Sequence, residues 1–141
     1  MYRVLKKGGT LIFNTWATIT TNEPFLITNT VVNSFFCKEP VTVFKEGPFC
    51  MDNEVVVLNL LKGAGFNNCS ANYITKHGTI KSAQDAANGF ITGLPTLNII
   101  QDKIPHLLGE IIAKLHSEFI ARWGDHPLKA ELNAWLYKAN K

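Results

Sequence analysis

The feature that most constrains the fold of this chain is a short apolar run behind a pair of glycines. Gly8 and Gly9 are a turn signal, and the run Thr10–Trp16 that follows them is apolar and bounded by turn residues. Such a run is typical of a strand that is buried on both faces, as in a parallel sheet. Because a parallel strand cannot stand without neighbours, the run predicts an α/β fold.

The segments on either side of this strand predict helices. Residues 2–5 fit the last turn of a helix, followed by two lysines at its negative end and by Gly8 as a left-handed cap. Asn22 is a suitable cap for a second helix, which the apolar spacing carries to about Cys37. We expect residues 41–44 to form a short extended piece.

The rest of the chain predicts three helices and two strands. Each expected helix has a capping residue at its start and a glycine near its end. The longest one has an apolar stripe from Ile104 to Phe119, and Pro105 would lie in its first turn without kinking it. The expected segments are a helix capped by Asp52, a strand over 68–76, a helix capped by Ser82 and ending near Ile91, a helix over 102–123 capped by Asp102, and a strand over 128–138.

The composition fits one globular domain and argues against several kinds of partner. The chain has 141 residues, 46% of them hydrophobic and 18% charged, with a net charge of +3. The basic residues are scattered, whereas a nucleic-acid-binding surface needs a clustered basic stripe. No apolar run reaches the roughly 18 residues that a membrane span needs. We therefore expect no nucleic-acid partner, no membrane span, and a cytoplasmic protein with reduced cysteines.

Side chains that could catalyse a reaction or bind a metal are dispersed along the sequence. Cys37, Cys50 and Cys69 form no CxxC pair, and the four histidines lack the spacing of a paired metal site. Cys50 follows Gly-Pro-Phe, where a small buried residue is a better interpretation than a nucleophile. Asp52 and Glu54 could act as an acid–base pair, but a helix cap and a first-turn carboxylate explain them more simply. We expect no metal site and assign no catalytic residue.

Three segments in a consistent order carry a family resemblance. They are residues 2–13, YRVLKKGGTLIF; residues 47–54, GPFCMDNE, with the later Leu60-Leu61 and Ala64-Gly65-Phe66; and residues 134–141, AWLYKANK. Together they resemble the C-terminal part of class I S-adenosylmethionine-dependent methyltransferases. In that family such segments enter the fifth strand, form a helix before the sixth strand, and close the sheet in quinone- and small-molecule-type members. Lys7 stands where the family commonly has proline.

The resemblance implies a definite place in the fold. Residues 1–141 would form a single partial domain, the C-terminal portion of a Rossmann-like methyltransferase sheet with strands five, six and seven. In the family, the seventh strand is inserted antiparallel between the fifth and the sixth. A long helical insert, about residues 82–123, would lie between the last two strands.

The resemblance also implies a site and its limits. The carboxyl end of the first strand would contribute to the substrate side of the methyl-transfer site, with Asn14, Thr15 and Trp16 as candidates. The family holds its cofactor, S-adenosylmethionine, with a glycine-rich loop and an acidic residue that lie upstream of these segments. No GxGxxG-like sequence occurs in this chain. We expect the chain alone to bind no cofactor, and Met1 to correspond to an internal residue of the family fold, as in a truncated or split gene.

Two hypotheses follow from these patterns. In the first, the chain is a C-terminal fragment of a methyltransferase that acts on a small molecule, and the fragment is inactive alone. In the second, it is a non-catalytic, self-associating remnant domain. An isolated fold of this kind has a strand with an open edge. We therefore expect a homodimer or an exchange of elements between copies.

Overall fold

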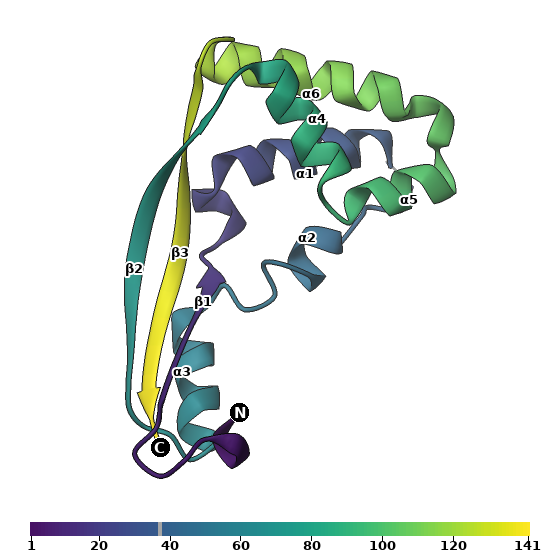
Figure 1. Ribbon diagram of the computed structural model, residues 1–141. Coiled ribbons are helices and arrows are strands. Elements are labelled where there is room, and N and C mark those ends of the chain that lie inside the picture. Colours follow the sequence, from purple (N-terminus) through teal and green to yellow (C-terminus); the bar gives the residue numbers. More distant parts are fainter. Residues whose placement is uncertain (37) are drawn as a thin grey trace.

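The computed structural model describes residues 1–36 and 38–141, and it has a mixed α/β architecture (Figure 1). Within these residues, a three-stranded antiparallel sheet is combined with six α-helices and three short 3-10 turns. The elements are η1 (Tyr2–Val4), β1 (Thr10–Trp16), η2 (Ile19–Thr21), α1 (Glu23–Phe35), α2 (Val43–Glu46), α3 (Glu54–Gly63), β2 (Asn67–Ile80), α4 (Ala83–Thr92), α5 (Thr96–Lys103), η3 (Pro105–Leu107), α6 (Leu108–Trp123) and β3 (Leu128–Asn140).

The last strand of the chain is the central strand of the sheet. The order is β1-β3-β2, and β3 runs antiparallel to both neighbours, so β1 and β2 run parallel to each other. Phe13 of β1 and Ala71 of β2 are both paired with Tyr137 of β3. This is the strand order that the resemblance implied, with the last strand inserted antiparallel between the other two. The prediction that residues 10–16 form a strand buried on both faces is wrong, because only one face of β1 is covered and Ile12 on the other face is 63% exposed. The three helices α4, α5 and α6 lie between β2 and β3 in the chain.

The long ribbon formed by β2 and β3 extends well beyond β1, and it divides the molecule into two halves (Figure 1). We call the end with α1, α4, α5 and α6 the helical half, and the end with β1 and α3 the sheet half. In the helical half, β3 buries Leu128 and Ala130. In the sheet half it buries Tyr137 and Ala139. Because alternate residues of a strand point to opposite faces, the two halves have their cores on opposite faces of β3.

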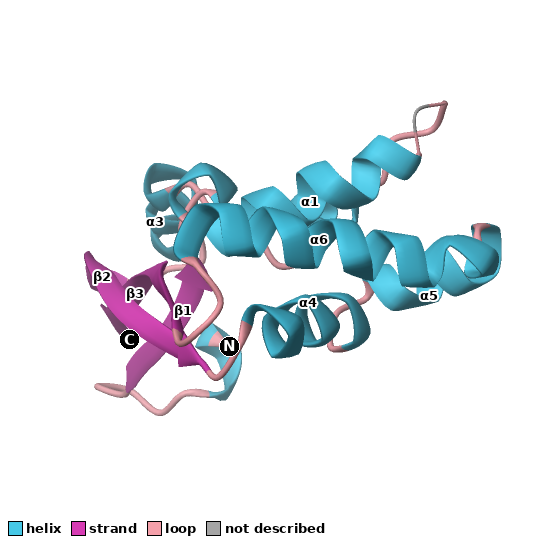
Figure 2. Cartoon of the chain, turned by 90° about the horizontal axis from the view of Figure 1, so that it is seen from above, coloured by secondary structure: helices cyan, strands magenta, loops and turns pink. Residues whose placement is uncertain are grey.

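The helical half has a continuous apolar core. It joins buried side chains of α1, α4, α5, α6 and β3, and Figure 2 shows these helices grouped beside the sheet. The stripe of α6 that the sequence predicted is fully buried at Ile111, Leu115 and Phe119. These buried residues recur every four positions, so one face of α6 carries the contacts and the other stays in solvent.

Asn22 connects the two halves through its side chain. It precedes α1 as expected, but its side chain makes no cap hydrogen bond. Instead, the fully buried amide donates from Nδ2 to the carbonyl of Asn133 at 3.0 Å and accepts from the backbone N–H of Asn133 at 2.8 Å. The amide therefore pairs with β3 as a backbone peptide group would, just beyond the end of β1 at Trp16.

Several local predictions are confirmed. Ser82 caps α4, and its hydroxyl accepts the N–H of Asp85 at 3.0 Å. Gly8 and Gly124 have φ of +79° and +78°, the left-handed conformation that suits glycine at a turn or helix end. Both later strands form, and both are longer than predicted. The expected end of the second helix at Cys37 lies outside the described residues.

Three local predictions are wrong. The cap of α3 is Asn53, whose side chain accepts the N–H of Val56, and not Asp52. Residues 41–44 do not form an extended piece, because the helical turn α2 begins at Val43. Residues 2–5 form a 3-10 turn over Tyr2–Val4 and not an α-helical turn. Each error concerns a stretch of one turn or less, where local preferences are nearly balanced.

The prediction of a single helix over 102–123 is also wrong, because Pro105 interrupts it. Asp102 lies in the last turn of α5 and does not cap a helix. Ile104, directly before the proline, has φ −143° and ψ 49°, outside the helical region. A proline disfavours the helical conformation in the residue before it. The chain therefore leaves α5, makes the 3-10 turn η3, and begins α6 at Leu108.

Candidate functional site

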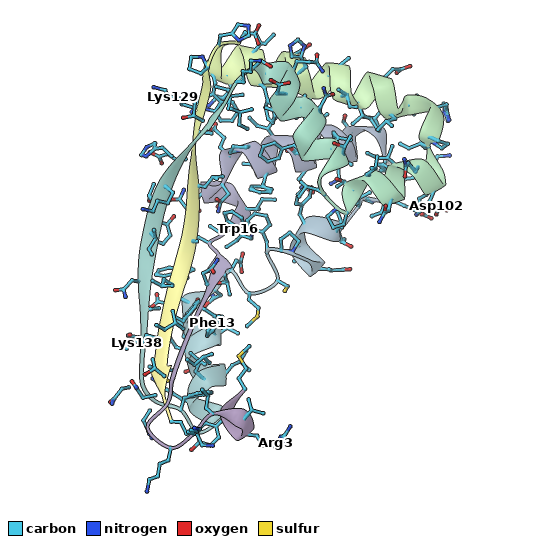
Figure 3. All side chains as sticks on the ribbon, viewed as in Figure 1. Arg3, Phe13, Trp16, Asp102, Lys129 and Lys138 are labelled. Atoms are coloured by element: carbon cyan, nitrogen blue, oxygen red, sulfur yellow. The ribbon has the colours of Figure 1, made fainter. Side chains whose placement is uncertain are left out.

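The three candidate residues at the carboxyl end of β1 point to two different faces of the sheet. Asn14 and Trp16 share one face, and Thr15 lies on the other, because strand residues alternate. Figure 3 shows Trp16 at the end of β1 that meets the helical half, and Phe13 further along the strand toward α3. The structure therefore separates Thr15 from Asn14 and Trp16.

Trp16 lies in a group of five aromatic rings, which we call the aromatic cluster. Its ring centroid is 5.3 Å from that of Phe25 and 6.2 Å from that of Phe49. Phe25 in turn contacts Phe44 and Phe90, with centroids 6.2 Å and 5.0 Å apart. The rings come from β1, α1, α2, the turn before α3, and α4. Five separate segments thus meet at the carboxyl end of one strand.

Two hollows flank the aromatic cluster. One has a volume of about 330 Å³, and Phe44, Phe49 and Ile19 contribute to its lining. The other has about 210 Å³ on the side of Phe25 and Phe90. A cavity of a few hundred Å³ that is lined mainly by apolar groups is typical of sites for small organic ligands. The space for a small apolar molecule therefore lies beside the other rings of the cluster, and Asn14 and Trp16 line neither hollow.

Asn14 supplies a polar group next to this apolar surface. Its side chain is exposed and makes no hydrogen bond to the part of the chain that the structure describes. It lies on the same face of β1 as Trp16 and opposite Leu136 of β3. An amide carries both donor and acceptor groups, so Asn14 is available to orient a ligand that rests against Trp16.

Thr15 is turned to the other face, toward Tyr137. The Thr15 Oγ1 and the Tyr137 hydroxyl are both buried and have no hydrogen-bond partner of good geometry among the described residues. Burial raises the pKa of Tyr137, the nearby Thr15 hydroxyl lowers it, and the carboxylates of Glu54 and Asp52 raise it further. The phenol therefore stays protonated at neutral pH. It is a buried polar group of the sheet half and is separate from the aromatic cluster.

The remaining reactive side chains do not converge. Cys50 is exposed, so the prediction of a buried residue at this position is wrong; it lies in the turn before α3, where no helix or strand covers it. His77 pairs with Glu131 at 3.3 Å and His126 with Asp125 at 3.0 Å, both on the surface. Among residues 1–36 and 38–141, no group of three or more ligating side chains could hold a metal ion.

Two larger hollows lie away from the end of β1, and exposed ion pairs contribute to their lining. One, of about 580 Å³, holds the pair Lys103–Glu39, whose nitrogen and oxygen are 3.0 Å apart. The other, of about 560 Å³, holds Arg122–Glu23 at 2.6 Å. The charges in these pairs are already compensated and face water, so they offer a ligand little net attraction.

The residues present do not fit a complete S-adenosylmethionine site. The side chains that gather at the carboxyl end of β1 are aromatic, and they provide no carboxylate for a ribose. The Gly63-Ala64-Gly65 segment does not provide a phosphate-type cradle either. It follows α3, and a Cβ at Gly65 would be 3.2 Å from the Tyr2 ring, so packing fills that space.

The sequence predicted Trp16 as a candidate residue but did not predict most of the residues around it. Phe44 and Phe90 lie in short helices whose patterns gave no sign of a shared site. Phe49 belongs to the GPF segment, so its position in a family motif was the available signal.

Comparison with known proteins does not identify a site: no protein-family model matches the chain, and no curated protein matches it. No helix of the described residues is long and apolar enough to cross a membrane.

Proposed function

We propose that this chain is the substrate-side, C-terminal part of a class I methyltransferase fold that acts on a small apolar molecule, and that it has no activity alone. The observation that carries the proposal is the strand order β1-β3-β2, with the last strand antiparallel between two parallel ones. The three sequence segments that resemble the family fall on β1, on the turn and helix before β2, and on β3, in the order that the family would require.

The aromatic cluster supports a particular class of methyl acceptor. Within the aromatic cluster, Phe25, Phe44 and Phe49 are buried in the core. Trp16 is only half-buried, so its accessible part offers a flat, apolar surface, and Asn14 offers one polar group beside it. Such a surface suits a small molecule with an aromatic ring, because ring faces and edges attract one another beyond the area that they bury. In a complete enzyme this wall would hold the acceptor in place for transfer, and positioning is a large part of the catalysis.

A cofactor role is not part of the proposal for this chain. In a complete enzyme, S-adenosylmethionine would supply the methyl group from its sulfonium centre. Residues other than the 141 of this chain would bind it. The part proposed for this chain is to bind the acceptor and to exclude water from one side of the site. We place the protein in the cytoplasm, where its cysteines stay reduced.

A two-ligand titration followed by NMR tests the proposal. With S-adenosylmethionine added to about 1 mM, we expect no shifts, and micromolar binding would overturn the claim that the cofactor site is outside this chain. With 1-naphthol as a small aromatic probe, we expect shifts of the Trp16 indole and the Asn14 amide. The indoles of Trp123 and Trp135 are internal controls. Shifts confined to those two indoles would contradict an acceptor wall at the aromatic cluster.

The second function is a non-catalytic, self-associating domain. The open edge of β1 among the described residues favours it, and it requires no cofactor site. The genomic DNA that precedes the codon of Met1 discriminates between the two. A reading frame there, intact or shifted, that encodes a glycine-rich loop after a strand would support the methyltransferase, and its absence would support the self-associating domain.

A further inference from the structure

The outer edge of β1 presents a regular row of unpaired backbone groups. Ala17 donates its N–H to Asn133 of β3, and the Gly9 carbonyl accepts from Lys141 just beyond the other end of the ladder. Because the direction of the groups alternates along an antiparallel pair, the odd residues of β1 face β3. The N–H and C=O groups of Thr10, Ile12, Asn14 and Trp16 face outward. No hydrogen bond joins them to any described residue. We call these groups the free edge of β1.

The two edges of the same sheet differ in their protection. The outer strand on the other side, β2, carries Lys76 and His77 and has a register shift between Asn67 and Ser70. Charges and bulges of this kind are the means by which edge strands avoid pairing with other chains. β1 has neither: its residues, Thr10–Trp16, include no charge and no proline, and its register with β3 is unbroken.

An apolar side chain lies exposed at the free edge itself. Ile12, at the middle of β1, is 63% exposed. Exposed apolar surface at a strand edge favours association.

We propose that two copies of this chain pair through the free edge of β1, antiparallel, about a two-fold axis at Phe13. In this register Ile12 of each copy lies opposite Asn14 of the other, and Thr10 lies opposite Trp16. All four residues have outward-facing groups, so each pair exchanges two hydrogen bonds. The result is one continuous six-stranded sheet. This inference deepens the second function above, the self-association of this chain, and it does not rest on the methyltransferase proposal.

The register follows from the alternating direction of the backbone groups along β1 and from the length of the strand. Pairing must match even residues with even residues, and centring on Phe13 brings all the outward-facing groups of β1 into bonds. A shift of the axis to Ile12 or Asn14 leaves one end unpaired. No like charges meet, since the strand has none. The two-fold axis is perpendicular to the sheet, so α3 and its copy lie on the same face, where Phe13 meets its own copy across the axis.

Sedimentation and amide exchange of the 141-residue chain test the dimer. Over about 1 to 200 µM we expect the mass to rise from 15.7 kDa toward twice that value. At the high concentration, the amides of Thr10, Ile12, Asn14 and Trp16 should become protected from exchange, while those of Leu11, Phe13 and Thr15 are protected at both concentrations. A monomer throughout, or even-numbered amides that exchange equally fast at both concentrations, would overturn the proposal.

A matched pair of variants at one position separates edge pairing from apolar contact. Ile12→Pro removes an outward N–H and leaves the ladder to β3 intact, because residue 12 donates nothing to β3. We expect it to weaken the dimer by about a hundredfold or more, and Ile12→Thr, which keeps the N–H, by about tenfold or less. Protection of Leu11 and Phe13 in both variants shows that β1 is still folded. Equal dimerisation of Ile12→Pro and the unchanged chain would contradict the proposal.

Discussion

The helical half and the sheet half differ in how much of their apolar surface is buried. In the helical half, α1, α4, α5 and α6 enclose fully buried residues such as Leu115 and Phe119. In the sheet half, α3 covers one face of the sheet through Val57 and Leu61, while Ile12 on the other face and Leu60 on the outside of α3 stay exposed. The helical half encloses its core, and the sheet half leaves apolar side chains exposed to water.

The difference shows which contacts hold the chain together and which remain available. A closed core gains its stability from buried apolar area within one copy. The sheet half has the same kinds of side chain but fewer covering elements among the described residues. Its surface is therefore the part of the molecule from which association gains most.

The largest expected effect is a truncation in the core of the helical half. Phe119 is fully buried and contacts Phe90 and Trp123, with ring centroids 5.6 Å apart in each case. Phe119→Ala should lower the free energy of unfolding by about 3–5 kcal/mol, through lost burial and a residual cavity. Its neighbour Ile120 is 40% exposed, and Ile120→Ala should change that free energy by about 0.5 kcal/mol or less. Urea unfolding measures the free energy of unfolding of both variants. Equal losses would contradict a core in which Phe119 is enclosed and Ile120 is not.

A smaller effect is expected at the connection between the halves. Asn22→Ala removes the amide that pairs with the backbone of Asn133 and leaves a buried N–H without its acceptor. The expected cost is about 2 kcal/mol of unfolding free energy. Thr21→Ala is the control: it removes an exposed methyl group and an exposed hydroxyl that donates to the Thr18 carbonyl, with an expected cost of about 0.5 kcal/mol or less. A cost for Asn22→Ala no larger than that of the control would show that the halves are held together by other contacts.

The smallest effect, with the opposite sign, is expected in the sheet half. Tyr137→Phe removes a buried hydroxyl that has no partner among the described residues, so unfolding free energy should be unchanged or rise by about 1 kcal/mol. The pKa of Tyr137 is raised by burial. As pH rises above the unfolded value of about 10, the unfolded chain loses the phenol proton while the folded chain keeps it, so stability falls.

The pH dependence provides the measurement for this third prediction. Thermal melts of the unchanged chain and of Tyr137→Phe, compared from pH 8 to about pH 11, should diverge above about pH 10, with the variant the more stable. Parallel curves over the whole range would show that the Tyr137 phenol is not held protonated by its burial.

Elements defined by long patterns could be predicted from the sequence, and positions decided by a single residue could not. The α6 stripe at Ile111, Leu115 and Phe119 gave its buried face correctly, because periodicity averages over several turns. The sequence pattern put Pro105 in the first turn of a long helix. In the structure, Pro105 keeps Ile104 out of the helical conformation, so α5 ends there. Asn53 and Asp52 are both good caps, and only the path of the chain into α3 decides between them.

The candidate site shows the same limit for contacts between distant segments. Asn14, Thr15 and Trp16 could be located at a strand end from the sequence alone. Their division between two faces follows from alternation, but their neighbours do not. Phe25 and Phe90 are brought together by the packing of α1 against α4, which no local pattern encodes. The peptide-like pairing of Asn22 with Asn133 joins residues 111 positions apart and is equally invisible in the sequence.

The central position of β3 has a consequence for how the protein is made. Both ladders of the sheet depend on residues 128–140, which are synthesised after β1, β2 and the helices between them. During translation, β1 and β2 have no strand partner until these residues have left the ribosome, and contacts of high sequence separation form late. The helical segments α4 to α6 can pack earlier. A nascent chain stalled before Leu128 would therefore expose two unpaired strands at once, and unpaired strands favour aggregation.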